Sequence, residues 1–460
     1  MQVINPSIFR AYDIRGTYPD QLNKVVVELL GQQIGAYALT HGQSIVVTGR
    51  DGRLSGPDLQ GALNLGLIKS GIRVIDVGMV PTPVLYFAAL TMGTGSGVMV
   101  TGSHNPPNYN GFKIMIDSRT LYGDDISGLY DGIIRGTSPE GEGSFEASNA
   151  LAPYMERICR DVTLTKRLKV AIDCGNGVAG VCAENLFARL GCDIVPLFTE
   201  VDGSFPNHHP DPSKLANLID LMAAVKIHNC DLGIAFDGDA DRVGIITETG
   251  KSIYADRLIM LLAEDVLIRN PGATIIYDVK CSRHLSSVIS NAGGQPLMWK
   301  TGHSLIKAKM RETGALLAGE MSGHIFFKER WYGFDDGLYT AARLLEIFSK
   351  SPKAVSVLFN QVPDDFSTPE LNIEVPDAEK FTLIKRVAAI LVDQGMPLSK
   401  IDGVRVDLDS GWGLIRCSNT TPNLVLRFEA ESEVALKHIQ SIMLDALQQA
   451  KPTLDLKLIC

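Results

Sequence analysis

The feature that most constrains this 460-residue chain is a strand–turn–helix–strand pattern that recurs three times. The copies occupy residues 45–77, 170–197 and 274–299, and each has a glycine between its helical stretch and its second apolar strand. Two strands joined by a helical crossover normally lie parallel, so each copy predicts a parallel α/β unit. Because the chain is also too long for one hydrophobic core, the repeats predict separate domains.

A further apolar strand follows each copy and ends in a polar loop that contains glycine. The three loops are residues 101–107, 237–242 and 319–324. In open α/β sheets, ligands bind outside the carboxyl ends of the strands. The loops therefore predict a single cleft lined by three different chemistries.

The pattern changes after Pro363 to strands and helices without the parallel repeat, which indicates a small α+β domain. The fold class we expect is α/β: three tandem similar α/β domains with mixed sheets, then a C-terminal α+β domain, around a central cleft. The expected domain boundaries are 1–148, 149–251, 252–364 and 365–460.

Composition excludes several classes of protein. A formal net charge of −9 argues against electrostatic binding to nucleic acid, although local basic clusters can still hold small anions. The chain shows neither the layout of a signal peptide nor an apolar run long enough to span a bilayer. The eight cysteines form no CxxC pair or zinc-type cluster, and Cys174, Cys192, Cys230 and Cys281 are expected in the core. We expect a cytoplasmic, reduced protein that binds neither nucleic acid nor membranes.

The first loop, TGSHNPP, places one hydroxyl, that of Ser103, between a glycine and a histidine. Two prolines stiffen the exit of this loop. A serine held in this way can act as a nucleophile or carry a covalent group. A plain turn between two strands explains the same residues, and the segment alone does not decide between the two interpretations.

The second loop holds three alternating carboxylates, Asp237, Asp239 and Asp241, which an extended segment would project to one face. Hard oxygen ligands suit Mg²⁺ or Ca²⁺. Arg242 stands where a calcium-binding loop needs glycine, so we predict Mg²⁺. A phosphoryl group on Ser103 would supply a further oxygen ligand. A solvated acidic turn is the alternative.

The remaining two loops carry groups that recognise sugars and phosphates. Glu320, Ser322 and His324 alternate, and a carboxylate with a hydroxyl can grip vicinal sugar hydroxyls. The fourth loop, RCSNTTP at residues 416–422, offers guanidinium, hydroxyl and amide donors for a phosphate. Ordinary polar turns are the alternative for both loops.

Together the four motifs TGSHNP, DGDADR, GEMSGH and RCSNTTP resemble those of the α-D-phosphohexomutases, in the same order and one to a domain. The resemblance extends over essentially the whole chain, including FRAYDIRG at residues 9–16 and TGHS at 301–304. Within that family the sequence is most similar to the bacterial phosphomannomutase/phosphoglucomutase branch, because of Met321 and WYGFDDG at residues 331–337.

The resemblance implies an isomerase in which a phosphoserine at Ser103 gives its phosphoryl group to a hexose monophosphate. The resulting hexose 1,6-bisphosphate, which also serves as activator, would turn around within the cleft while the last domain moves. Lys113 and His324 both stay open as the general acid/base. The implied catalytic residues are Ser103, Lys113, Arg15, Arg242 and His324. The implied Mg²⁺ ligands are Asp237, Asp239, Asp241 and the group on Ser103. The implied substrate-binding residues are Tyr12, His303, Glu320, Ser322, Arg416, Ser418, Asn419, Thr420 and Arg427.

Three other functions are alternatives to this one. Phosphoglucosamine mutase uses the same phosphoryl-transfer chemistry on a different sugar, and Met321 in the sugar-binding loop slightly disfavours it. A non-catalytic sugar-phosphate binding protein would need neither a phosphorylated serine nor a metal. A nicotinamide dehydrogenase is disfavoured because the turn after residues 170–173 lacks the GxGxxG spacing. We expect hexose phosphates as the partners and a monomer, with a dimer as the alternative.

Overall fold

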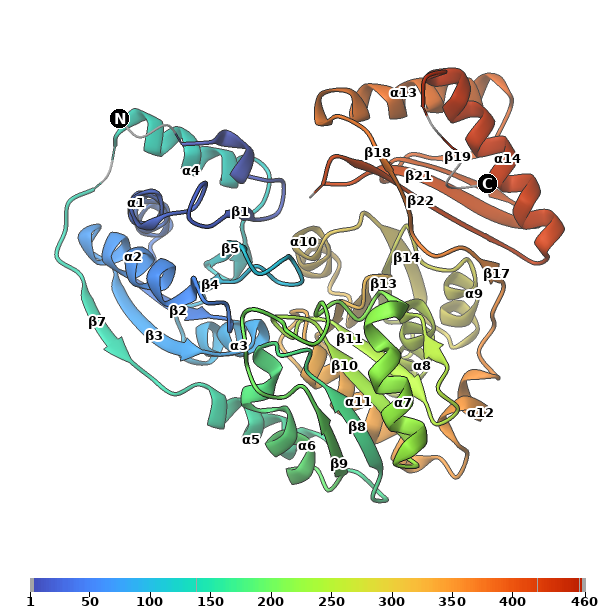
Figure 1. Ribbon diagram of the computed structural model, residues 1–460, viewed down its shortest axis with the longest axis horizontal. Coiled ribbons are helices and arrows are strands. Elements are labelled where there is room, and N and C mark those ends of the chain that lie inside the picture. The colour runs from blue at the N-terminus through green and yellow to red at the C-terminus, as the bar shows by residue number, and fades with distance from the viewer. Residues whose placement is uncertain (1–3, 138, 420, 455, 457–460) are drawn as a thin grey trace.

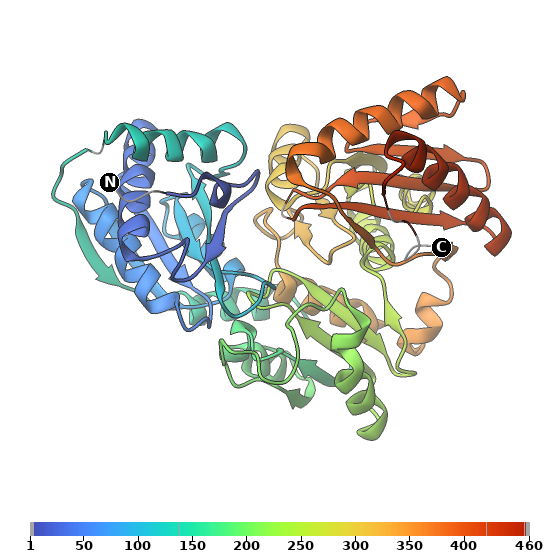
Figure 2. The same ribbon diagram turned by 45° about the horizontal axis from the view of Figure 1, so that its top comes forward.

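The computed structural model describes residues 4–137, 139–419, 421–454 and 456. Four sheets follow one another along the chain. Figures 1 and 2 show the blue first domain and the red last domain on opposite sides of the molecule, with the green second and yellow third domains between them. The predicted fold class, three α/β domains and a C-terminal α+β domain, is confirmed.

The first sheet is mixed, and its central strands are parallel. In sheet order its strands are β1 (Ile14–Thr17), β5 (Tyr109–Ile116), β4 (Gly97–Val100), β2 (Ile45–Arg50), β3 (Arg73–Met79) and β7 (Ser144–Ala147), with β6 (Arg119–Thr120) beside β5. The α-helices of this part are α1 (Lys24–Thr40), α2 (Gly56–Lys69), α3 (Thr82–Thr91) and α4 (Asp124–Arg135). Pro57 lies in the first turn of α2, where its missing N–H costs no helical hydrogen bond.

The second and third sheets repeat this plan. The second has β12 (Ser252–Ile253), β11 (Val243–Thr247), β10 (Leu232–Phe236), β8 (Lys169–Asp173) and β9 (Asp193–Leu197). The third has β14 (Gln295–Trp299), β13 (Thr274–Asp278), β15 (Leu317–Gly319) and β16 (Ile325–Phe327). Their α-helices are α5 (Leu151–Asp161), α6 (Ala183–Arg189), α7 (Ile219–Ile227), α8 (Ala255–Arg269), α9 (His284–Asn291), α10 (His303–Thr313), α11 (Gly337–Lys350) and α12 (Val355–Phe359).

All three repeats have one strand order, in which an antiparallel return strand follows the strand that carries the loop. The orders are β3–β2–β4–β5, β9–β8–β10–β11 and β14–β13–β15–β16. The first three strands of each set are parallel, as the crossover pattern predicts. Each polar loop therefore leaves the carboxyl end of a buried parallel strand.

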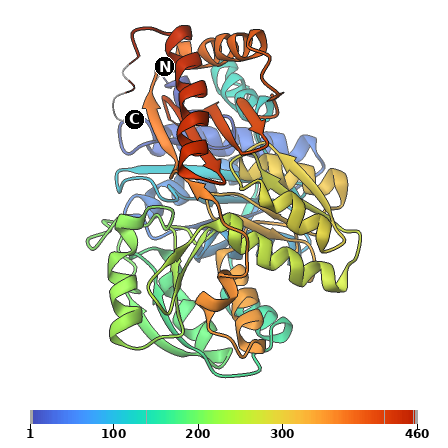
Figure 3. The same ribbon diagram turned by 90° about the vertical axis from the view of Figure 1, so that its right-hand side faces the viewer.

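The fourth domain is an antiparallel sheet covered by two helices on one face (Figure 3). Its strands are β17 (Phe366–Ser367), β22 (Asn423–Ala430), β21 (Gly411–Cys417), β20 (Val404–Leu408) and β19 (Leu398–Ser399), with β18 (Leu371–Glu374) also beside β22. The helices are α13 (Asp377–Asp393) and α14 (Glu433–Ala450).

The last domain has a hydrophobic core of its own, and a small cluster of Val279, Trp412 and Leu414 joins it to the third domain. One cluster of buried side chains runs through the three α/β domains and includes Tyr86, Phe236 and Leu345. The fourth domain has its own cluster, which includes Leu426 and Met443. Because a domain with its own core can shift as a unit, this division fits a mobile C-terminal domain.

Two smaller expectations can also be checked. Cys174, Cys192, Cys230 and Cys281 are buried, and all seven described cysteines are free thiols. Among the helices that the structure describes, none combines the length and the apolar character needed to cross a membrane.

Candidate active site

Four loops, one from each domain, meet in a cleft of about 430 Å³. They connect β4 to β5, β10 to β11, β15 to β16, and β21 to β22. The predicted site residues that line the cleft are Tyr12, Arg15, Ser103, Lys113, Arg242, His303, Glu320, Ser322, His324, Arg416, Ser418 and Asn419. The cleft expected from the strand ends is therefore present.

Ser103 is held in an unusual backbone conformation at the base of the cleft. Its φ of 48° lies in the left-handed region that non-glycine residues rarely adopt. The N–H of Ser103 donates to Thr101 Oγ1 at 2.8 Å, and its hydroxyl donates to Asp237 Oδ2 at 3.0 Å. His104 Nδ1 lies 3.1 Å from the same hydroxyl, and burial lowers the pKa of His104 well below its ordinary value. The hydroxyl is thus fixed between a carboxylate and a neutral imidazole.

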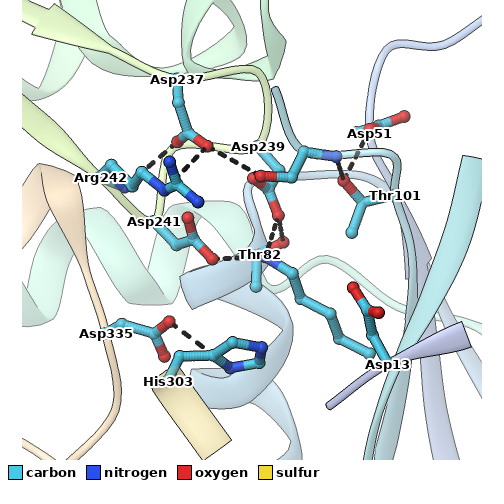
Figure 4. A network of polar contacts seen from close by, with 12 residues as sticks. Asp13, Asp51, Thr82, Thr101, Asp237, Asp239, Asp241, Arg242, His303 and Asp335 are labelled. Carbon is cyan, nitrogen blue, oxygen red and sulfur yellow. Dashed lines mark hydrogen bonds and ion pairs between the residues drawn. The ribbon is translucent and has the colours of Figure 1, made fainter. Parts of the chain in front are cut away.

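The three aspartates of the second loop converge beside Ser103 (Figure 4). Asp237, Asp239 and Asp241 are fully buried, and each offers an oxygen within 4.8 Å of the others. The segment is a tight turn with Ala240 at a φ of 63°, and not the extended strand that the alternation suggested. The expected convergence is confirmed, but the reason for it is the turn.

Backbone hydrogen bonds from neighbouring elements clamp this turn in place. The N–H of Thr82, at the start of α3, donates to the carbonyl of Asp239 at 2.9 Å, and the Thr82 hydroxyl donates to the same residue's carboxylate at 2.6 Å. The N–H of Gly337, at the start of α11, donates to the carbonyl of Ala240 at 3.1 Å. The first and third domains therefore both fix the acidic loop of the second.

Lys113 supplies positive charge to this acidic group. Its Nζ donates to Asp239 Oδ2 at 2.6 Å and also to Asp241 Oδ2. Although burial alone would lower the pKa of Lys113, these two carboxylates raise it well above its ordinary value. Burial and the two neighbouring aspartates raise the pKa of Asp237. The lysine thus offsets only part of the buried negative charge.

The donor set suits a divalent cation with a preference for oxygen ligands. In the described part of the chain, Asp239 Oδ1 and Asp241 Oδ1 are buried and accept no hydrogen bond. A buried carboxylate oxygen without a partner is costly, whereas a hard cation satisfies several such oxygens at once. The acidic cluster can therefore hold a metal ion.

The third loop is tied to the second across the cleft. Arg242 Nε donates to His324 Nε2 at 2.9 Å, so this nitrogen of His324 is the hydrogen-bond acceptor. His324 Nδ1 lies 3.1 Å from Asp335 Oδ2, and His303 Nδ1 lies 3.9 Å from the same oxygen. Asp335 thus faces two histidines of the cleft from a fully buried position.

Glu320 and Ser322 present polar atoms to the cleft. Glu320 Oε2 accepts a hydrogen bond from the Gly302 N–H at 3.2 Å. Among the described residues, nothing donates to Glu320 Oε1, and Ser322 Oγ is buried without a partner. Burial raises the pKa of Glu320 to about 7. Both atoms are available to a ligand in the cleft.

The fourth loop reaches over the cleft to the first domain. Arg416 Nε donates to Asp402 Oδ2 at 3.0 Å. Asn419 Nδ2 donates to the hydroxyl of Tyr12, which in turn donates to the carbonyl of Thr301 at 3.0 Å. Tyr12 therefore joins the first, third and fourth domains at one point.

Arg427 and Thr420 were also predicted to bind the phosphate. Arg427 does not line the cleft: its guanidinium lies 3.3 Å from Asp256 and donates to the carbonyl of Lys280, so it is already neutralised within the domain contact. Thr420 lies outside the described residues.

The cleft is also lined by residues that the sequence motifs did not predict. They are Asp211, Ser213, Lys214, Lys280 and Glu370. The run NHHPDPSK at residues 207–214 was the available signal, because so many ligand-type side chains are unusual between a strand and a helix. Lys280 lies two residues beyond the carboxyl end of β13, where a ligand-binding residue is expected.

Known protein domains and relatives match this chain along almost its whole length. The three alpha/beta/alpha domains described for phosphoglucomutase/phosphomannomutase match residues 6–136, 152–250 and 254–366, and the C-terminal domain of the same proteins matches 370–446. The chain is 55% identical to a phosphomannomutase/phosphoglucomutase of Pseudomonas aeruginosa over 97% of both chains. It is 50% identical to a phosphoglucomutase of Neisseria gonorrhoeae over 96% of both.

A solved structure shares the arrangement of the domains as well. It is that of a phosphoglucomutase/phosphomannomutase family protein from Burkholderia thailandensis, at 52% identity and a TM-score of 0.93 over 98% of this chain and 99% of that one. All four domains are thus matched in order, and the resemblance carried by the four loops is confirmed. The chain belongs to the phosphoglucomutase/phosphomannomutase family of isomerases.

Proposed function

We propose that the protein is a phosphohexomutase that interconverts the 1-phosphates and 6-phosphates of mannose and glucose through a phosphoserine at Ser103 and a hexose 1,6-bisphosphate. The observation that carries this proposal is the Ser103 hydroxyl, 3.0 Å from Asp237 where the four loops meet. The names of the similar Pseudomonas and Neisseria proteins support the choice of sugars.

The charged side chains around Ser103 suit phosphoryl transfer. Asp237, Asp239 and Asp241, with an oxygen of the Ser103 phosphoryl group, would hold Mg²⁺, which when bound withdraws charge from the transferring group. Arg15 and Arg242 bring cationic groups to the same end of the cleft and offset charge that develops during transfer.

Lys113 is the better candidate for the acid that protonates the oxygen leaving phosphorus. Its raised pKa keeps it protonated, so it can donate to an oxygen that gains charge. The Nε2 lone pair of His324 is already engaged by Arg242. We therefore assign His324, with His303, to positioning the substrate.

The rest of the cleft recognises the sugar and its second phosphate. Glu320 Oε1 and Ser322 Oγ would pair with sugar hydroxyls, because both are buried and lack a partner in the described chain. The phosphate that does not react would lie against the fourth loop. The residues proposed for that phosphate are Arg416, Ser418, Asn419 and Thr420.

Glu320 should give the enzyme a pH dependence. With its pKa raised to about 7 by burial, Glu320 takes up a proton as the pH falls through 7 and loses its charge-assisted bonds to the sugar. We expect kcat/KM to fall by about tenfold per pH unit on the acid side. Glu320→Gln should lower the plateau and remove this acid limb in a pH profile of kcat/KM. An unchanged acid limb in the variant would assign the titration to another group.

The function is tested by turnover on mannose 1-phosphate, glucose 1-phosphate and glucosamine 1-phosphate, each with Mg²⁺ and a trace of glucose 1,6-bisphosphate. Comparable rates on the first two and little on the third are expected. Dominant turnover of glucosamine 1-phosphate would keep the chemistry and make the protein a phosphoglucosamine mutase. Binding of all three without turnover would favour a non-catalytic sugar-phosphate binding protein.

We propose further that the protein works as a cytoplasmic monomer on small hexose phosphates alone, without nucleic acid or membrane. One chain supplies all four loops of the cleft, so a second copy is not needed to complete the site. A dimer in a sedimentation experiment would overturn the monomer while leaving the chemistry unchanged.

A further inference from the structure

A buried arginine lies directly beneath the Ser103 loop. Arg53 follows β2 and is 1% exposed. Its guanidinium donates four hydrogen bonds to backbone carbonyls of one loop. The acceptors are Ser103 at 2.7 Å, Asn105 at 2.6 Å, Pro106 at 2.6 Å and Tyr109 at 2.8 Å. The loop therefore wraps around the guanidinium.

Asp51 holds the other side of the same loop. Its Oδ2 accepts from Thr101 Oγ1 at 2.7 Å and from the Gly102 N–H at 3.2 Å (Figure 4). The same carboxylate lies 3.3 Å from Arg53 Nε. The Asp51–Arg53 pair thus fixes the chain before and after Ser103.

Close packing also holds the loop against Arg53. A Cβ at Gly102 would lie 2.4 Å from Arg53 Cζ, so only glycine fits over the guanidinium. From the second domain, the ring of Phe205 packs against Arg53 with 5.2 Å between its centroid and Cζ. A charge this deeply buried needs compensation, and here four carbonyls satisfy the two terminal nitrogens while the Asp51 carboxylate faces Nε at 3.3 Å without a hydrogen bond.

The backbone of Ser103 needs such support. A non-glycine residue at positive φ is strained and persists only where its surroundings hold it. The Ser103 carbonyl is held by Arg53, and its N–H is held by Thr101, which Asp51 orients. Release of either group would let the residue relax and turn its hydroxyl away from Asp237.

We propose that Arg53 is a positioning residue for phosphoryl transfer, acting through the Ser103 backbone with Asp51 as its partner. The inference rests on the proposed role of Ser103 as the phosphoryl carrier. Arg53 is absent from the cleft lining, so its effect falls on the reacting hydroxyl and not on substrate binding. Lysine cannot replace it, because one ammonium with three donors lacks the planar fork that serves four carbonyls.

The test is Arg53→Lys, assayed for kcat, KM and the rate at which glucose 1,6-bisphosphate phosphorylates Ser103. Misplacement of a reacting group by about 1 Å can cost on the order of 100-fold in rate. We expect kcat and the phosphorylation rate to fall together by about that factor, with KM unchanged within error. Arg343→Lys is the matched control, because Arg343 is equally buried but pairs with Glu329 and Asp265. The control should retain kcat.

Two results would overturn the inference: an unchanged kcat in a folded Arg53→Lys, or a loss that only follows the unfolded fraction seen in thermal melting. If Arg53→Lys does not fold, Asp51→Asn takes its place and should show the same split between kcat and KM. Ser103→Ala, assayed alongside, distinguishes a failure of the proposed function from a failure of this inference. Full turnover without Ser103 would sink the proposed function, whereas an inactive Ser103→Ala beside a fully active Arg53→Lys would sink this inference alone.

Discussion

Ser103→Ala is expected to abolish the phosphoenzyme and to lower turnover by about 10⁴-fold or more, because the substitution removes the atom that carries the phosphoryl group. Binding should survive, since the residues proposed for the sugar and the distal phosphate lie on the third and fourth loops. Intact-mass measurement after incubation with glucose 1,6-bisphosphate would show the adduct in the native protein and not in the variant.

Ser96→Ala is the matched control for this substitution. Ser96 is a fully buried serine that directly precedes β4, whereas the Ser103 loop leaves the other end of the same strand. Its hydroxyl oxygen accepts from the Asp117 N–H at 3.1 Å, far from the acidic loop in the sheet. Turnover of the folded variant should stay within about twofold of the native rate, because the loss of this one buried hydrogen bond acts on stability and not on the transferring group. Full turnover by Ser103→Ala without any phosphoenzyme would refute the mechanism.

The repeated fold was predictable because its signals are local. Each copy combines an apolar strand, a glycine and a helical stretch, and these follow from side-chain periodicity and turn chemistry. The parallel order around β2, β8 and β13 then follows from the helical crossovers, which connect parallel strands. Three loops at the carboxyl ends of these strands were therefore predictable as the lining of one cleft, whereas the fourth loop was assigned from its phosphate-binding side chains and the family resemblance.

The contacts between loops were not predictable in this way. The Arg242–His324 hydrogen bond joins residues that are far apart in sequence, and nothing in the periodicity of either segment selects the other. Asp335 faces both cleft histidines within the third domain, where its segment forms a bridge with Phe326 of β16. The first contact depends on how the second and third domains dock and the second on tertiary pairing within one domain, and local patterns encode neither.

One residue that the resemblance implies as a phosphate ligand does not line the cleft in the structure. Arg427 lies a few residues beyond the fourth loop. In β22 it is a strand residue whose charge is taken up by Asp256 of the third domain. A residue next to a loop in sequence can thus serve the domain contact and not the ligand.

Removal of divalent cations is the second large effect that we expect. Without a divalent cation, Lys113 pairs with Asp239 and Asp241, and Arg242 lies 4.0 Å from Asp237. Two side-chain cations thus face three buried carboxylates, and a transferring phosphoryl group would add more negative charge there. Chelation with EDTA should lower turnover by at least about 100-fold, since electrostatic stabilisation of the transferring group is lost. Excess Mg²⁺ should restore the rate and raise the melting temperature, because a ligand of the folded state stabilises by about 2.7 kcal/mol at 100 times its Kd.

Asp241→Asn tests the metal site more specifically, because the expected effect on turnover differs from the expected effect on thermal stability. The amide relieves like-charge repulsion, so the metal-free variant should melt no earlier than the native protein while losing most turnover and most of its thermal response to Mg²⁺. Asp365→Asn is the control: Asp365 belongs to a second group of metal-ligand type side chains with His284 and Glu429, but Arg283 already pairs with it at 2.9 Å. This control should keep the full response to Mg²⁺. Loss of the response in Asp365→Asn, with retention in Asp241→Asn, would move the metal from the cleft to the contact between the third and fourth domains.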